Sequence, residues 1–261
     1  GQHIDPNPQE IPDPVAPPSR CGRRILILVD QSGSISNAGA QQTVKDAVTS
    51  FILGFQGTPG QISVVGFGNN VKEISGPYGT YYDTLNDSSG KMAELVDTTI
   101  PALQFNEWTN WHAGIQSAYG IPTSTGDLEY HDYVPDMVVF VTDGDPTRHL
   151  TPTGESSNSP SNNDYNHHAS FAANSANLAR ELGVQDVIGV LVNNANSTSS
   201  VSRLASVVGG TKWDGDFPGN AEVADYFAGG FNDLGGIIQS ITARECGGAL
   251  TIQKRFSDAS I

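Results

Sequence analysis

Residues 25–36 of this chain have the sequence ILILVDQSGSIS. The first five residues are apolar without interruption, which is typical of a strand buried on both faces in a parallel sheet under helices. The run ends at Asp30, and a polar turn follows. The stretch therefore predicts a buried strand over residues 25–29 that delivers polar side chains to one edge of a sheet.

The rest of the chain alternates between apolar runs and amphipathic segments. Strands are predicted over residues 62–67, 137–141 and 187–192, and helices over residues 44–55, 111–119, 169–182, 201–208 and 223–243. Strands that alternate with helices predict an α/β fold, here a doubly wound, mostly parallel sheet with helices on both faces. Residues 145–166 are rich in Ser, Asn, Pro and Thr, and they predict a long surface loop.

The composition is that of one folded domain with an acidic surface. Of the 261 residues 37% are hydrophobic, which suffices for one sizeable core. The formal net charge is -15, and so negative a surface repels nucleic-acid phosphates and anionic lipid headgroups. No apolar run is long enough to span a bilayer. We therefore expect no nucleic-acid partner and no direct membrane insertion, and an acidic partner would need a metal or a local basic feature to hold it.

Side chains with oxygen atoms follow two of the predicted strands. Asp30, Ser32 and Ser34 lie in the turn after the first strand, Asp143 follows a later strand, and Thr109 opens a predicted helix. Ligands of open α/β sheets bind outside the carboxyl ends of the strands, so these side chains are expected to share one rim. Oxygen ligands without His or Cys suit Mg²⁺, Ca²⁺ or Mn²⁺ and disfavour zinc.

The predicted ligands are expected to leave one coordination position of the metal open for a partner. Two carboxylates and three hydroxyls do little more than neutralise a divalent cation. Mg²⁺, the ion that we expect first, prefers six ligands and keeps some of its waters, so one position is expected to stay open. A carboxylate from a partner could fill it, which makes the site a docking point.

Three segments together resemble a known kind of site. ILILVDQSGSIS, TNW at residues 109–111 and VVFVTDGDP at residues 138–146 are similar to the metal-ion-dependent adhesion site of von Willebrand factor A domains, as in integrin inserted domains and microbial surface adhesins. The resemblance covers roughly residues 21–247. It implies that the hydroxyls of the two serines and usually the threonine contact the metal, and that the aspartates act directly or through water.

One part of the site departs from the family pattern. Residues 105–108 have the sequence FNEW, where many relatives have small glycines before the threonine. Glu107 could add charge near the metal or face solvent there, and we expect it to face solvent. We also expect His149, His167 and His168 at the surface, because no other His or acidic residue stands at a recognisable ligand spacing from them.

The resemblance also suggests a pairing of the two cysteines. In the fold that it implies, the first strand is central and the last helix returns to the same pole, which brings Cys21 and Cys246 close together. We expect a disulfide there, which requires an oxidising compartment. Two free thiols are the alternative.

The two ends of the chain differ from the part between them. Residues 1–20 are proline-rich and polar and predict an extended arm. Residues 248–261 begin a strand-like pattern in which Lys254 shares a face with apolar residues. This tail resembles the opening strand of the immunoglobulin-like domains of Gram-positive pilins, where such a lysine forms an isopeptide bond. The start of a following domain and a plain tail with Lys254 in solvent both stay open.

The resemblance implies a non-enzymatic adhesion module on the cell surface, at the tip of a pilus or in a cell-wall-anchored adhesin of Gram-positive bacteria. Its partner would be an extracellular protein that presents an acidic side chain, with other pilin subunits as further partners. A structural pilus or matrix subunit with a stabilising metal is one alternative. A Mg²⁺-dependent phosphoryl-handling enzyme is another, although enzymes with an aspartyl nucleophile at the position of Asp30 want a second aspartate where this chain has Ser32.

Overall fold

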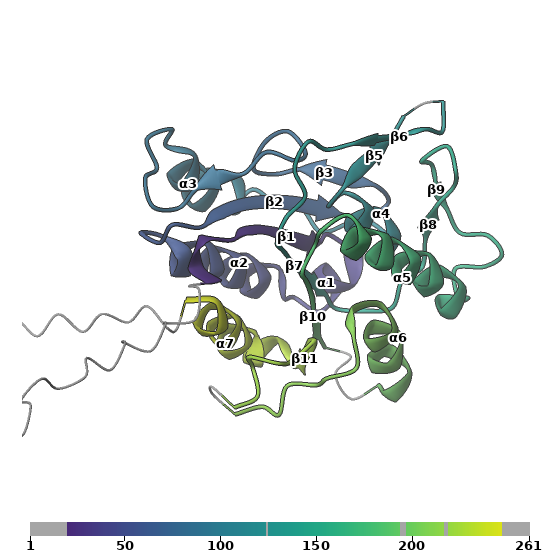
Figure 1. Ribbon diagram of the computed structural model, residues 1–261. Helices are drawn as coiled ribbons and strands as arrows, with labels where there is room; N and C mark the ends of the chain where they lie inside the picture. Colours follow the sequence, from purple (N-terminus) through teal and green to yellow (C-terminus); the bar gives the residue numbers. More distant parts are fainter. Residues whose placement is uncertain (1–19, 124, 194–196, 217–218, 247–261) are drawn as a thin grey trace, which may run out of the picture.

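The computed structural model describes residues 20–123, 125–193, 197–216 and 219–246 of the chain. The expected arm before residue 20, the tail at residues 248–261 and Lys254 lie outside these ranges. A seven-stranded sheet runs through the molecule (Figure 1). Its strands in spatial order are β11 (Tyr226–Gly229), β10 (Asp186–Val192), β7 (Met137–Thr142), β1 (Arg24–Asp30), β2 (Gln61–Phe67) and β3 (Val71–Glu73), and β4 (Tyr82–Asp83) also pairs with β2.

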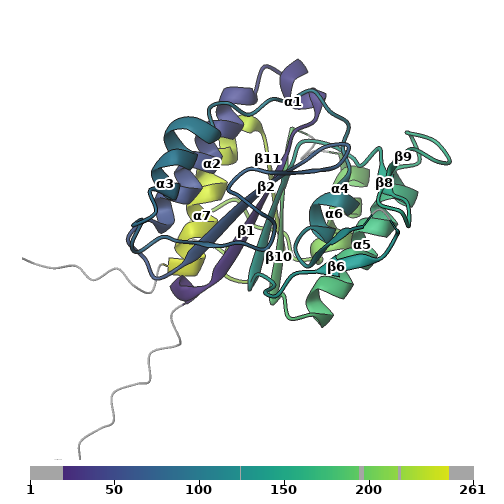
Figure 2. The same ribbon diagram turned by 90° about the horizontal axis from the view of Figure 1, so that it is seen from above.

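Helices cover both faces of this sheet (Figure 2). One face carries α2 (Gln41–Phe55), α3 (Lys91–Glu94, continued by a π-helical turn at Leu95–Thr99) and α7 (Leu234–Cys246). The other carries α4 (Trp111–Gln116), α5 (Tyr165–Glu181) and α6 (Thr198–Val208). The strands from β11 to β2 are parallel, whereas β3 and β4 run antiparallel to β2. The predicted doubly wound α/β fold is confirmed.

The shorter elements lie around this frame. Two hairpins stand apart from the main sheet, β5 (Gly120–Pro122) with β6 (Leu128–Tyr130) and β8 (His149–Leu150) with β9 (Ser156–Ser157). The short helix α1 (Gly33–Asn37) follows β1, and single 3-10 turns at Arg20–Gly22 and Phe231–Asp233 precede β1 and α7.

The alternation of side chains along β1 explains why its sequence is apolar throughout. Ile25, Ile27 and Val29 pack in the core under α2 and α7, whereas Leu26 and Leu28 pack in the core under α4, α5 and α6. All five are at most 2% exposed. A strand buried on both faces cannot carry a polar residue at low cost, so the first polar side chain marks its end.

The register of the central strands brings their last residues to one rim. Val29 of β1 pairs with Gly66 of β2 on one side and with Val141 of β7 on the other. Because all three strands run in the same direction, Asp30 and the residues after β7 emerge side by side.

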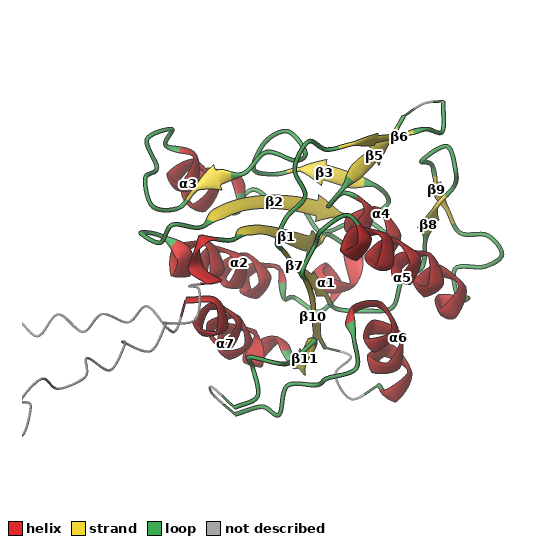
Figure 3. Cartoon of the chain, in the orientation of Figure 1, coloured by secondary structure: helices red, strands yellow, loops and turns green. Residues whose placement is uncertain are grey.

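One stretch folds differently from the prediction. Residues 223–243, predicted as a single helix, form the edge strand β11 and only then α7 (Figure 3). Gly229 and Gly230 separate the two elements and weaken any helix across this point. Tyr226 and Phe227 instead pair in parallel with β10 and are buried on opposite faces of the sheet.

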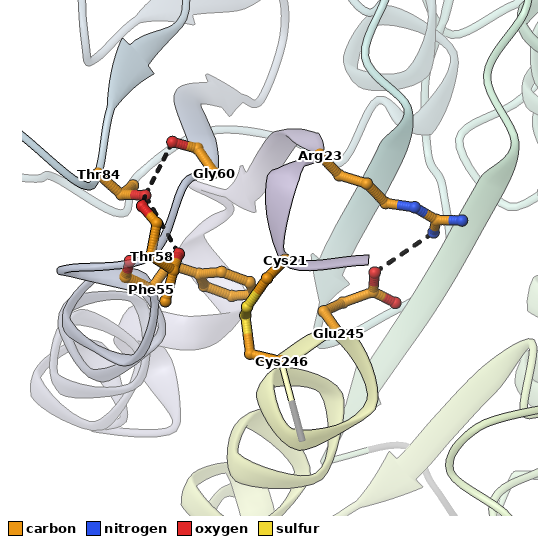
Figure 4. The surroundings of a disulfide bond; sticks show 8 residues. All are labelled: Cys21, Arg23, Phe55, Thr58, Gly60, Thr84, Glu245 and Cys246. Carbon is orange, nitrogen blue, oxygen red and sulfur yellow. Dashed lines mark hydrogen bonds and ion pairs between the residues drawn. A yellow bond between two sulfur atoms is a disulfide. The ribbon is translucent and has the colours of Figure 1, made fainter. Parts of the chain in front are cut away.

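A disulfide joins the beginning and the end of the described chain. Cys21 and Cys246 are bonded, with their Cα atoms 4.8 Å apart (Figure 4). Beside the bond, Arg23 Nη1 forms an ion pair with Glu245 at 3.3 Å. The last turn of α7 is therefore fastened covalently to the segment that enters β1.

Candidate functional site

The rim at the carboxyl ends of β1 and β7 holds four of the five predicted ligand side chains. The hydroxyl of Ser34 donates a hydrogen bond to Asp143 Oδ1 (2.8 Å). Ser32 Oγ lies 3.2 Å from the same Asp143 oxygen and 2.9 Å from Ser34 Oγ. The backbone N–H of Ser32 donates to Asp30 Oδ1 (2.8 Å), which holds the Asp30 carboxylate against the turn. Oxygen atoms from two separate strands thus converge on one point.

The two aspartates of this rim are buried close to each other. Asp30 is 0% exposed and Asp143 is 1% exposed. Burial raises the pKa of Asp30 to about 7, and the charge of Asp143 adds to the rise, whereas hydrogen bonds from Thr142 and Ser32 oppose it. Burial likewise raises the pKa of Asp143, against hydrogen bonds from Ser34 and Ser32. Both carboxyl groups would ionise more readily if a cation lay between them.

A chain of hydrogen bonds connects Asp30 to the core. The Thr142 hydroxyl donates to Asp30 Oδ2 (2.7 Å), and the indole N–H of Trp111 donates to Thr142 Oγ1 (3.2 Å). Trp111 and Thr142 are completely buried. Neither residue is among the five predicted ligands. Thr142 could have been noticed because it is the last residue of β7 and directly precedes Asp143.

Backbone contacts hold Thr109, the fifth predicted ligand, at the same rim. The N–H of Gly33 donates to the carbonyl of Glu107 (2.8 Å), and the N–H of Glu107 donates to the carbonyl of Gln31 (3.1 Å). Residues 107–109 therefore run beside the turn after β1. Among the described residues, no hydrogen bond joins the buried Thr109 hydroxyl to the other four side chains.

The expectation that Glu107 faces solvent is wrong. Its carboxylate forms an ion pair with Lys72, and Oε2 accepts a hydrogen bond from the N–H of Asn69 (2.8 Å). Asn110, which is not among the predicted ligands, adds a second link, because its Nδ2 donates to the carbonyl of Asn69 (3.0 Å). Its Oδ1 accepts the N–H of Ala113 (3.0 Å) and so caps α4. These bonds tie the loop before Thr109 to the turn after β2.

The expectation that His149 and His168 lie at the surface is also wrong. They are 7% and 0% exposed, and His167 is partly buried. The Nδ1 atoms of His149 and His168 lie 3.0 Å apart, and His168 Nε2 lies 2.8 Å from the carbonyl of Ser161. The ring of Phe171 stacks on that of His149 with the centroids 4.2 Å apart. Both imidazoles therefore have at least one polar partner inside the protein, as buried polar groups usually do.

The donor set of the rim suits a hard divalent cation. It offers carboxylate and hydroxyl oxygens and no nitrogen or sulfur, as Mg²⁺, Ca²⁺ and Mn²⁺ prefer. Within the described ranges, no group of three or more His, Cys, Asp or Glu residues could hold a metal ion. Hydroxyl groups would therefore have to complete the coordination. The residues able to do so are Asp30, Ser32, Ser34, Thr109 and Asp143.

Comparison with known proteins assigns part of the chain to a family. Residues 25–146 match the model of the von Willebrand factor type A domain, and all five candidate ligands fall within that match. The chain contains a von Willebrand factor type A domain. No curated protein matches the sequence.

Solved structures share the fold of this von Willebrand factor type A (vWA) domain at low sequence identity. The PilB minor pilin from Streptococcus sanguinis is 14% identical, with a TM-score of 0.57 over 89% of this chain and 62% of the pilin. The pilus adhesin SpaC from Lactobacillus rhamnosus GG is 13% identical, with a TM-score of 0.54 over 85% of this chain and 30% of SpaC. A vWA protein from Catenulispora acidiphila is 14% identical, with a TM-score of 0.54 over 86% of this chain and 42% of that protein. The chain thus spans less than two thirds of the length of each, and the likeness shows the fold alone.

Two further features of the described residues complete the description. No helix in the described ranges is long and apolar enough to cross a membrane. A cavity of ≈ 650 Å³, lined in part by Arg24, Tyr81 and Tyr133, lies at the end of the sheet where β1 begins. The candidate ligands lie at the other end of the same strand.

Proposed function

We propose that this vWA domain is a non-enzymatic, metal-dependent adhesion module of the extracellular cell surface. Asp30, Ser32, Ser34, Thr109 and Asp143 would hold a divalent cation, Mg²⁺ first and Ca²⁺ or Mn²⁺ as alternatives. The cation would bind an acidic side chain of a protein on a host or neighbouring cell. A tip position on a pilus or in a cell wall, with other pilin subunits as neighbours, belongs to the same proposal.

The observation that carries this proposal is the convergence of Ser32 and Ser34 on one oxygen of Asp143, beside the buried Asp30. Two neighbouring carboxylates without exposed surface repel each other when both are ionised, and a divalent cation removes that repulsion. The fold supports the proposal because a minor pilin and a pilus adhesin share it. The disulfide supports an extracellular location, since such bonds persist in oxidising compartments.

Each residue has a separate part in such a site. The serine hydroxyls and the carboxylates supply oxygen ligands, and the cation supplies the positive charge that an acidic partner requires. Thr142 and Trp111 hold Asp30 in place through their hydrogen bonds. The Glu107 backbone fixes Thr109 next to the turn after β1.

The test is binding of the full chain to a panel of immobilised matrix and cell-surface proteins in Mg²⁺, in Ca²⁺ and in EDTA. We expect binding with metal and none in EDTA. Asp143→Ala is expected to abolish this binding. Asp46→Ala removes an exposed carboxylate on α2 and should leave it unchanged. Binding that is indifferent to EDTA, or that survives Asp143→Ala in a folded protein, would refute the proposal.

A structural role for the metal is the second candidate function. It is favoured by the complete burial of Asp30, because a cation that relieves the repulsion between two buried carboxylates must also stabilise the fold. If stabilisation were the whole role, Mg²⁺ would raise the melting temperature while no protein on the panel bound in a metal-dependent way.

A further inference from the structure

Two loops beside the candidate metal rim carry a tryptophan and an arginine that the proposed site does not use: Trp108 precedes α4, and Arg148 follows β7. The guanidinium of Arg148 lies over the ring of Trp108, with Cζ 4.7 Å from the ring centroid. Trp108 directly precedes Thr109, and the backbone N–H of Arg148 donates to the Thr109 carbonyl (3.1 Å). Both residues are therefore fixed on either side of a proposed metal ligand.

Arg148 differs from the other arginines in its partners. Its Nε is buried without a hydrogen-bond partner, and no described carboxylate forms an ion pair with it. The other arginine side chains that the structure describes are each held by ion pairs or by backbone carbonyls, namely Arg23, Arg24, Arg180, Arg203 and Arg244. In a chain with 28 acidic residues and a net charge of -15, Arg148 is thus the described arginine whose guanidinium neither an ion pair nor a backbone carbonyl holds.

Trp108 is unusual in its exposure. It is 47% exposed, whereas Trp111, three residues later, is completely buried. Tryptophan and arginine are the side chains most enriched among residues that dominate binding energy at protein interfaces. A guanidinium that stacks on an aromatic face keeps its planar edge available for hydrogen bonds to a carboxylate.

We infer that Arg148 and Trp108 form a second anchor for the partner, which therefore presents two carboxylates, one to the metal and one to Arg148. This inference rests on the proposed function, since the first carboxylate is the one that the metal holds. The apolar part of the partner segment next to the second carboxylate packs on the exposed face of Trp108. Two anchors on one rim select a particular spacing between the acidic groups, which a metal alone cannot do.

The probes are synthetic peptides with blocked termini that carry one glutamate, or two glutamates separated by zero to six glycines. They are titrated into the ¹⁵N-labelled full chain in Mg²⁺ while the Arg148 Nε–H and Trp108 indole N–H resonances are followed. At one spacing we expect the two-glutamate peptide to bind roughly tenfold more tightly than the one-glutamate peptide and to shift both resonances.

Arg148→Gln should remove this advantage and leave binding of the one-glutamate peptide and of Mg²⁺ unchanged. Lys212→Gln removes the same charge from an exposed site and should preserve the advantage.

The possible failures point to different errors. If both kinds of peptide bind equally and only with metal, the second anchor is wrong and the metal-dependent adhesion site stands. An advantage that persists in Arg148→Gln also overturns the second anchor. If no peptide binds in a metal-dependent way at millimolar concentration, the acidic ligand of the proposed function is wrong, and the inference is wrong with it.

Discussion

At the scale of single residues, the protonation of Asp30 affects the charge of the rim. Its carboxyl group has no exposed surface, and its pKa is raised to about 7 by burial and then by Asp143. In the unfolded chain the same group ionises near its ordinary value of 3.8. A metal ion bound at the proposed site would therefore compete with this proton.

The first prediction concerns the pH dependence of stability. In EDTA the folded protein keeps the Asp30 proton up to about pH 7, whereas the unfolded chain releases it near pH 4, so this group makes the metal-free fold less stable as pH rises between these values. The rise in melting temperature on adding Mg²⁺ should therefore grow from pH 5 to pH 8. Calorimetric melting of paired Mg²⁺ and EDTA samples measures it, and Asp30→Asn should make the two melting curves coincide. A Mg²⁺ effect of constant size across this range would contradict the prediction.

Thr142 offers a second test at the residue scale. Thr142→Val keeps the shape of the side chain but removes the donor to Asp30 and the acceptor for Trp111, two buried hydrogen bonds. We expect a loss of about 1–3 kcal/mol in the free energy of unfolding, measured in urea. Thr142→Ser keeps both hydrogen bonds and should lose less. Equal losses in the two variants would mean that the methyl group, not the hydroxyl, matters at this position.

At the scale of secondary-structure elements, the sequence predicts those strands that a local run of apolar residues determines. The apolar runs of β1 and β7 identify both strands, and parallel pairing alone then places Asp30 beside Asp143. The edge strand β11 was missed because it has only four residues, and its apolar side chains also fit the spacing of a helix. The ion pair of Glu107 with Lys72 was missed because it joins a loop to strand β3, which lies far from that loop in the sequence.

The hairpin of β8 and β9 illustrates a similar limit. Its polar sequence predicts a surface loop, yet His149 and His168 are buried where the hairpin meets α5. His112 of α4 adds a further contact, because its Nδ1 accepts the N–H of Leu150 (3.0 Å). Burial of a histidine depends on partners that the fold supplies, and these cannot be inferred from neighbours in the sequence.

The pKa of His112 predicts how acid affects the hairpin of β8 and β9. Burial, followed by the charge of His149, lowers the pKa of His112 from 6.5 to about 4, so the fold favours the neutral ring. The stability that this ring contributes is present above pH 6.5 and is lost as pH falls towards 4, because protonation at Nδ1 removes the acceptor for Leu150. Hydrogen exchange, corrected for its intrinsic pH dependence, should show residues 145–164 opening between pH 6.5 and pH 4.

The matched variant for this prediction is His112→Asn. The asparagine side-chain oxygen can accept the Leu150 N–H in place of Nδ1, and it does not titrate in this range. The opening of the hairpin in acid should become smaller in this variant. An unchanged response would assign the acid sensitivity to His149 and His168, whose pKa values burial also lowers.

At the scale of the whole molecule, β1 connects two ends with different tasks. Its last residue, Asp30, lies at the candidate metal rim, and the segment before its first residue is bonded through Cys21 to the end of α7. A pulling force that enters at Cys246 can pass through the disulfide into the central strand. Such a force would reach the rim without unfolding α7, which would suit the proposed adhesion module.

The last prediction separates these two ends. The disulfide links residues 225 positions apart, and closing so long a loop in the unfolded chain is expected to contribute about 2–5 kcal/mol to stability. Replacing both cysteines by serine should therefore lower the melting temperature by roughly 5–15 °C.

The Mg²⁺ affinity of this double serine variant, measured by calorimetry below the melting range, should stay unchanged, because the cysteines lie at the opposite end of β1 from Asp30. Arg23→Gln removes the neighbouring ion pairs with Glu245 and Asp186 and keeps the disulfide; because Arg244 still pairs with both carboxylates, this variant should cost less stability than the double serine variant. A double serine variant that melts like the unaltered protein would show that packing alone holds α7, and one that loses Mg²⁺ affinity while folded would show that the two ends of β1 are coupled.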